Sequence, residues 1–167
     1  MKKLTLKNHF LMAQPQIQVK SLQDWLFSLK LHGKESRSRT RFIGLISARI
    51  KELDNERIKL AEEYAEKNKK GEIIYLEKVK DKDGKETGKT KEITEKKDGT
   101  IFKFKDAEKF QKVWLEYLNE DLIIDVSPET NETIYTVRDI ILNSNEEFNN
   151  ISATIYEEWC RCFENIK

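Results

Sequence analysis

A regular stripe of apolar residues in the first half of the chain predicts one long helix at about residues 36–68. This stretch contains no proline, and its only glycine is Gly44. Large side chains recur in steps of three and four residues, and only Arg57 interrupts them: Ile43, Ile46, Ile50, Leu53, Leu60 and Tyr64. Such spacing forms a coiled-coil-like seam, and about 33 residues rising about 1.5 Å each give a rod of about 50 Å. We expect Arg57 to extend its charged end to solvent or to form a buried ion pair that fixes the register.

Shorter patterns precede this helix. Leu4 and Leu6 alternate with polar residues, which predicts a short strand or extended arm. Ser21 is followed three residues later by Asp24, a spacing that marks a helix N-terminus. The helix then carries an apolar stripe made by Leu22, Trp25, Leu26 and Leu29. Gly33 is expected to end it, because glycine readily adopts the left-handed conformation of a C-terminal cap.

The middle of the chain is dominated by charged residues. Alternating apolar positions predict a strand at 72–79, and the apolar residues of 101–104 predict the strand that returns beside it. Residues 80–99 between them contain Ile93 as their only large apolar side chain. We expect this charged insert to form a solvated, mobile hairpin tip or loop.

The last third of the chain predicts further helices and one strand. Asp106 is a good cap for a helix with a thick apolar stripe, which consists of Phe110, Val113, Trp114, Tyr117 and Leu118. Residues 122–126 predict a buried strand that Ser127-Pro128 ends, and 133–142 are β-branched at first and ambiguous after that. The final helix begins at Asn150 or Ser152 and buries Ile155, Trp159, Cys162 and Phe163.

Together these patterns predict a single α+β domain over residues 1–167. One long central helix at about 36–68 is accompanied by a charged β-hairpin or loop insert at about 80–99 and by shorter flanking helices. A chain of 167 residues has the size of one domain, and its eight Phe, five Tyr and three Trp supply material for a core. No stretch approaches the roughly 18 apolar residues of a membrane span, so we expect no membrane partner.

Charge is distributed unevenly, although the formal net charge is only +1. Residues 1–60 hold 13 Lys/Arg and 5 Asp/Glu, whereas residues 116–167 hold 3 and 12. One explanation is that the two ends pack together and offset each other's charge. The other is that a basic face meets an acidic or phosphate-bearing partner.

Four cations surround the predicted start of the long helix, opposed only by Glu35: Lys34, Arg37, Arg39 and Arg41. Positive side chains oppose the macrodipole at a helix N-terminus, whereas the free backbone N–H groups there favour an anion. Arginine also binds phosphate or carboxylate through two parallel hydrogen bonds. These four residues are therefore the candidate partner- or anion-binding site. The alternative is that they lie in a loop before the helix and pair with the acidic C-terminal third.

Residues for catalysis or metal binding are scarce. The only histidines, His9 and His32, stand in no motif with a carboxylate or serine at useful spacing. The only cysteines, Cys160 and Cys162, point to different sides of a helix, and no second pair of ligands exists. We expect both to be ordinary reduced cysteines of a cytoplasmic protein, and we predict no catalytic site, no cofactor and no metal site.

The order of the segments carries a resemblance. An opening Leu4-Thr5-Leu6-Lys7-Asn8 precedes the long Lys/Glu-rich helix, a charged segment leads to Phe104-Lys105-Asp106, and the run Leu118-Asn119-Glu120-Asp121-Leu122-Ile123-Ile124-Asp125 follows. Over roughly residues 3–126 the chain resembles an uncharacterised family of small bacteriophage and prophage proteins from low-GC Gram-positive bacteria. The resemblance implies a phage setting and no known reaction, and it offers no catalytic residues to transfer.

Three functions follow as hypotheses, and none of them is enzymatic. The first is a phage or prophage accessory protein in the host cytoplasm that binds a host protein and inhibits an antiviral defence system. The second is a virion tail assembly factor or minor structural protein, whose long helix binds a partner helix or self-associates. The third is a nucleic-acid-binding protein that uses Lys34, Arg37, Arg39 and Arg41. It is not favoured, because no aromatic residues interleave with the arginines.

Overall fold

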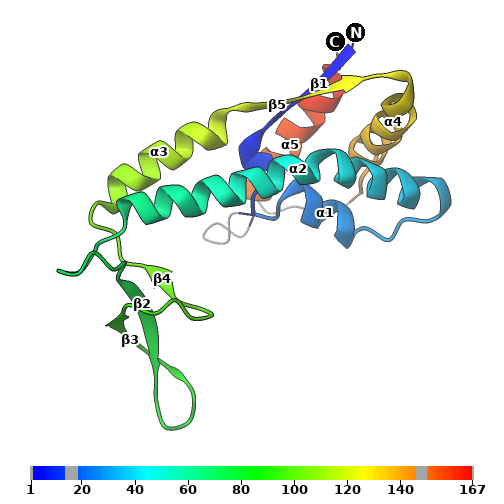
Figure 1. Cartoon of the computed structure of the whole chain (residues 1–167). Coiled ribbons are helices and arrows are strands. Elements are labelled where there is room, and N and C mark those ends of the chain that lie inside the picture. Colours follow the sequence, from blue (N-terminus) through cyan, green and yellow to red (C-terminus); the bar gives the residue numbers. More distant parts are fainter. Residues whose placement is uncertain (1, 14–18, 146–149, 167) are drawn as a thin grey trace. The chain divides into compact units, whose positions relative to one another are not determined.

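The computed structural model describes residues 2–13, 19–145 and 150–166 of the chain (Figure 1). The chain divides into two compact units. Unit 1 consists of Met1–Leu53 and Tyr117–Lys167, and unit 2 consists of Asp54–Glu116. That residues 1–167 form a single domain stays a prediction.

The α+β class predicted from the sequence is confirmed. The described residues form, in order, β1 (Lys2–Lys7), the 3₁₀ turn η1 (Asn8–Phe10), α1 (Leu22–Ser28), α2 (Gly33–Tyr64), β2 (Tyr75–Lys80), β3 (Glu86–Ile93), β4 (Ile101–Phe102), α3 (Ala107–Asn119), β5 (Asp121–Val126), α4 (Pro128–Leu142) and α5 (Asn150–Glu164). The predicted long helix is α2, which has 32 residues and starts and ends a few residues earlier than expected. Within the described ranges, no helix combines the length and the apolar character needed to cross a bilayer.

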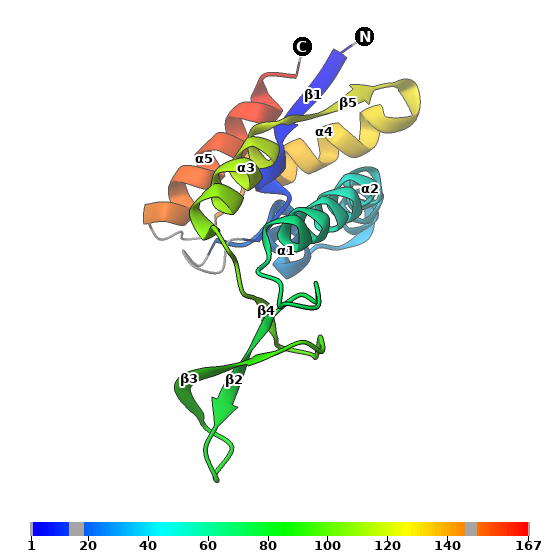
Figure 2. The ribbon, with the colours of Figure 1, turned by 60° about the vertical axis from the view of Figure 1, so that its left-hand side comes forward.

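Unit 1 contains a two-stranded antiparallel sheet of β1 and β5, in which Leu4 is paired with Ile124. α4 packs on β5, α5 packs on β1, and the two helices contact each other (Figure 2). Leu4, Leu6 and Ile124 are buried, whereas Ile123 is 55% exposed. The predicted strand at 122–126 is therefore confirmed, but only one of its sides is buried, because successive side chains point to opposite sides of a strand.

Aromatic side chains connect three helices of unit 1. The ring of Trp25 in α1 lies 5.5 Å from that of Trp159 and 6.0 Å from that of Tyr156, both in α5, measured between centroids. Phe42 of α2 lies 5.7 Å from Phe163 of α5, and both are fully buried. Aromatic pairs at these separations stabilise the core beyond the area that they bury.

α1 begins where the sequence predicts and ends earlier. Ser21 Oγ accepts a hydrogen bond of 3.0 Å from the N–H of Asp24, which confirms Ser21 as the N-cap. The helix ends at Ser28, so the prediction that Gly33 ends it is wrong, and Gly33 is instead the first residue of α2. The φ of Gly33 is +55°, in the left-handed region that favours glycine. The residue therefore serves the turn into α2.

The apolar seam of α2 is buried within the folded chain, as shown by Ile43, Ile46, Leu53 and Leu60. Arg57 has a side chain that is 52% exposed and lies 3.5 Å from Asp54. Of the two expectations for Arg57, the side chain that reaches solvent is confirmed and the buried ion pair is wrong. Next to it, Glu56 has a buried Oε2 atom.

Unit 2 contains a three-stranded antiparallel sheet in the order β3-β2-β4. β2 forms a hairpin with β3, and its other edge pairs with β4 (Figure 2). The prediction that the strand of residues 101–104 returns beside the first strand is confirmed for Ile101 and Phe102, which pair with Leu76 and Tyr75. The charged insert at 80–99, predicted as a hairpin tip or loop, supplies the eight-residue strand β3, and the expected returning strand is the third strand of the sheet.

Ion pairs join the exposed strands of this hairpin. Lys91 lies 2.6 Å from Glu77, and Lys78 lies 2.9 Å from Glu86. The hydrogen bond from Lys91 is the largest influence on the pKa of Glu77 and lowers it. Charged side chains of opposite sign thus stabilise β3, which has Ile93 as its only large apolar side chain.

Residues 128–142 form the helix α4, which settles the ambiguity of this segment. Ser127 is its N-cap, Pro128 is its first residue, and the hydroxyl of Thr130 accepts a hydrogen bond of 2.9 Å from the N–H of Ser127. This reciprocal capping arrangement outweighs the β-branched residues that follow it.

Candidate functional site

The first turns of α2 place the four candidate cations on two sides of the helix. All four lie inside α2, so the alternative that they belong to a loop before the helix is wrong. Lys34, Arg37 and Arg41 are spaced i, i+3 and i+7 and therefore share one side. Arg39 falls on a different side of the same turns. Helix geometry alone thus places three of the cations on one side of α2 and Arg39 on another.

Arg39 binds the end of α1. Its Nη1 donates hydrogen bonds to the carbonyl oxygens of Leu29 at 3.0 Å and Leu26 at 3.4 Å, and its Nη2 donates to Ser36 Oγ at 3.3 Å. The guanidinium also lies 5.5 Å from the ring centroid of Phe27. A cation is favourable at the C-terminal end of a helix, where carbonyl oxygens lack partners within the helix. Arg39 is therefore separated from the other three cations, and its hydrogen bonds connect α1 with α2.

Lys34, Arg37 and Arg41 remain together on the surface, and we call these three residues the basic face. All three are exposed. Lys34 Nζ lies 2.9 Å from Oε1 of Glu132 in α4. Within the described ranges, the side chains of Arg37 and Arg41 make no hydrogen bond and no ion pair. The face thus presents two guanidinium groups and one paired ammonium group to solvent.

Glu132 is the carboxylate next to the basic face. The hydrogen bond and the charge of Lys34 are the main causes that lower the pKa of Glu132, and the charges of Arg41 and Arg37 lower it further. Of the expected pairing between the basic cluster and the acidic last third, the described residues show one ion pair, Lys34 with Glu132. No pattern in the sequence singles out Glu132, although the helix start at Ser127-Pro128 places it in the second turn of α4.

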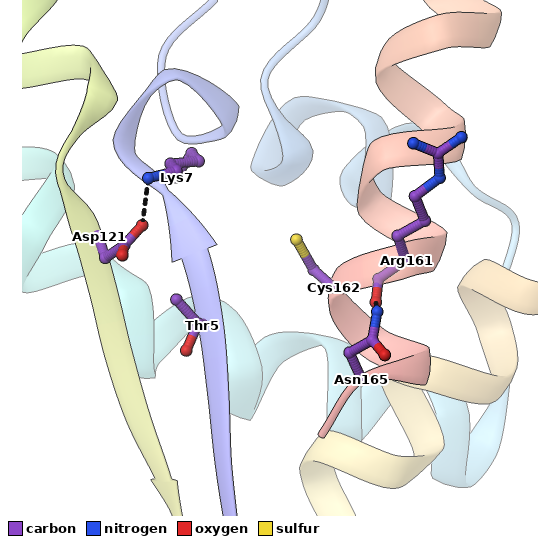
Figure 3. A pocket seen from close by; sticks show the side chains of 6 residues that line it. All are labelled: Thr5, Lys7, Asp121, Arg161, Cys162 and Asn165. Carbon is purple, nitrogen blue, oxygen red and sulfur yellow. Dashed lines mark hydrogen bonds and ion pairs between the residues drawn. The ribbon is translucent and has the colours of Figure 1, made fainter. Parts of the chain in front are cut away.

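A second feature of unit 1 is a small pocket between β1, β5 and α5 (Figure 3). It has a volume of about 260 Å³ and is lined by Thr5, Lys7, Asp121, Arg161, Cys162 and Asn165. Lys7 Nζ lies 2.7 Å from Asp121 and donates a hydrogen bond of 2.9 Å to the carbonyl oxygen of Asn119. Asn165 Nδ2 donates to the carbonyl oxygen of Arg161 at 2.8 Å. Lys7 and Asp121 of the lining thus bind each other, and the Arg161 guanidinium binds Glu157.

The thiol in this pocket is not activated. Burial is the main cause that raises the pKa of Cys162; Glu158 and Asp121 raise it further, and Lys7 lowers it. A protonated thiol is a poor nucleophile. The described lining contains no histidine that could act as a base for it.

The two histidines have different surroundings. His9 Nε2 lies 3.5 Å from Glu158 Oε2, whereas His32 is exposed just before α2. Cys160 and Cys162 are free cysteines, as expected. Among the residues that the structure describes, no group of three or more His, Cys, Asp or Glu side chains is placed to hold a metal ion.

No protein-family model, no curated protein and no solved structure matches this chain at a significant level.

Proposed function

We propose that this chain is a non-enzymatic phage or prophage accessory protein that binds a host protein through the basic face. The observation that carries the proposal is the position of Lys34, Arg37 and Arg41 on one exposed side of α2, with Arg39 turned to α1. Cations held on a rigid helix select partners of opposite charge and increase the rate of association. The phage setting rests on the resemblance over residues 3–126, and we propose inhibition of an antiviral defence system as the consequence of binding.

The surroundings of the basic face favour a protein partner over nucleic acid. Glu132 lies beside its cations, and a carboxylate at such a surface repels a phosphate backbone. In the described part of the chain, no aromatic ring lies against Lys34, Arg37 or Arg41, whereas readers of single strands stack bases on such rings.

The assembly hypothesis has less support from the long helix. Self-association through the seam of α2 requires an exposed apolar stripe, but Ile46 and Leu53 are fully buried in the folded chain. These seam residues are therefore not available to a partner helix.

Affinity purification from a host lysate tests the proposal. The basic-face variant carries Lys34→Ala, Arg37→Ala and Arg41→Ala. A matched control carries Lys82→Ala, Lys85→Ala and Lys89→Ala, which removes the same charge from exposed positions of the β2–β3 hairpin. We expect the wild type and the control to retain a host protein that the basic-face variant loses, and the retention to survive nuclease treatment.

Three outcomes contradict this proposal. Equal retention of the host protein by all three chains shows that the basic face does not bind it. Loss of all retained material after nuclease treatment favours the nucleic-acid hypothesis. Retention of virion proteins only favours the assembly hypothesis. Where a host protein is retained, its activity in the presence of the wild type and of the basic-face variant shows whether binding inhibits it.

A further inference from the structure

We propose that the basic face recognises carboxylates spaced along a helix of its partner, and that Glu132 is an internal competitor that leaves Lys34 when such a partner binds. This inference rests on the proposed function and specifies the chemistry of the partner. It starts from two observations, the spacing of the three cations and the carboxylate that already lies on them.

The spacing of the cations fits acidic side chains on a second helix. A helix rises about 1.5 Å per residue, so Lys34 and Arg37 are about 4.5 Å apart along the axis, and Arg37 and Arg41 about 6 Å. Glutamates at i, i+3 and i+7 of another helix repeat these steps. Each arginine can then hold a carboxylate through two parallel hydrogen bonds.

The chain itself contains one example of this pairing. Glu132 projects from α4 and places its carboxylate 2.9 Å from Lys34. Arg41 and Arg37 also act on this carboxylate through their charge. The side chains of Lys34 and Glu132 are 61% and 64% exposed, so solvent reaches both. An exposed ion pair contributes little to stability, and an incoming carboxylate can therefore replace Glu132 at small cost.

Glu129 provides the matched comparison, because it is an exposed carboxylate of the same helix with different partners. The hydrogen bond from Ser127 is the main cause that lowers the pKa of Glu129, followed by a hydrogen bond of its own backbone. No cation of the basic face contributes to that shift. Removing the charge of Glu129 thus changes the net charge of α4 without freeing Lys34.

The experiment measures binding of an alanine-based helical peptide that carries glutamates at i, i+3 and i+7. Fluorescence anisotropy compares the wild type, Glu132→Gln and Glu129→Gln. We expect Glu132→Gln to bind the peptide about twofold to fivefold more tightly, as the small contribution of an exposed ion pair allows. Glu129→Gln is expected to match the wild type. In the wild type, saturation with peptide is expected to move the carboxyl titration of Glu132, followed by NMR, back toward its ordinary value.

Four results overturn the inference. Equal affinities of Glu132→Gln and Glu129→Gln show that only net charge matters, and weaker binding of Glu132→Gln shows that Glu132 positions Lys34 for the partner. Failure of the wild type to bind the peptide, or tighter binding of a short DNA duplex, shows that helical carboxylates are not the ligand. The lysate experiment decides the proposed function separately, since loss of the host protein by the basic-face variant does not depend on Glu132.

Discussion

Replacing Asn8 by alanine tests how the parts of unit 1 are held together. Asn8 follows β1 directly and is completely buried. Its Nδ2 donates a hydrogen bond of 2.8 Å to the carbonyl oxygen of Tyr117, and its Oδ1 accepts one of 3.1 Å from Arg49 Nε. Arg49 in turn lies 2.9 Å from Glu120. One small side chain thus connects the end of β1 with α2 and with the junction of α3 and β5.

The magnitude follows from these two hydrogen bonds. A neutral hydrogen bond contributes about 0.5–1.5 kcal/mol net, and one to a charged group about 1.5–3 kcal/mol. The shorter alanine side chain also leaves unfilled space in a buried position. We therefore expect Asn8→Ala to lower the free energy of unfolding of unit 1 by about 2–4 kcal/mol.

Urea unfolding followed by tryptophan fluorescence measures this loss. Trp25 and Trp159 lie in unit 1 and are buried, whereas Trp114 lies in unit 2. A Trp114→Phe background therefore makes the signal specific for unit 1. The slope of the transition should stay unchanged, because it follows the surface exposed on unfolding.

Asn143→Ala is the matched control, since Asn143 is exposed and its Nδ2 donates to the carbonyl oxygen of Asp139 at 2.8 Å. An exposed substitution of this kind changes stability by about 0.5 kcal/mol at most. A double-mutant cycle of Asn8→Ala with Arg49→Met should give a coupling of about 1 kcal/mol or more. The reasoning is refuted if Asn8→Ala costs no more than Asn143→Ala, or if the cycle gives no coupling.

The remaining predictions concern glycines, a tyrosine and the thiols. Gly33→Ala should lower the free energy of unfolding by about 1 kcal/mol, because the φ of Gly33 is positive. Gly44 lies in the interior of α2 with open space at its Cβ position, so Gly44→Ala should raise the free energy of unfolding by about 0.5–1 kcal/mol. Thermal melting that shifts both variants in the same direction contradicts this. Burial is the main cause that raises the pKa of Tyr156 from 10.0 to about 12. This tyrosine therefore ionises first in the unfolded chain, and the free energy of unfolding should fall as pH rises from 10.0 to about 12. An absorbance titration in which Tyr156 of the folded protein ionises at the ordinary pKa of tyrosine would contradict this. Burial also raises the pKa of Cys160 and Cys162, so both should react slowly with a thiol reagent until urea is added.

Local patterns were enough for the elements that short-range physics determines. The alternation of Leu4 and Leu6 identified β1, and the spacing of Ser21 and Asp24 identified the start of α1. The 3–4 repeat identified α2 and its buried seam. Each of these signals depends on hydrogen bonds and side-chain directions within a few residues, and these are the same wherever the element lies in the fold.

Contacts between distant residues decided the rest. The strand β3 comes from charged residues that gain partners only across the sheet, as Lys91 does with Glu77. Likewise helical spacing puts Arg39 on a different side of α2 from Arg37 and Arg41, but only the packing of α1 gives it two carbonyl oxygens as partners. Glu132 became part of the site because α4 brings it to Lys34. The sequence by itself therefore determined the helices α1, α2, α3 and α5, the strands β1 and β5, and the presence of a basic cluster. Only the tertiary structure decided which cations face solvent, because the partner that takes a charged side chain lies far away along the chain.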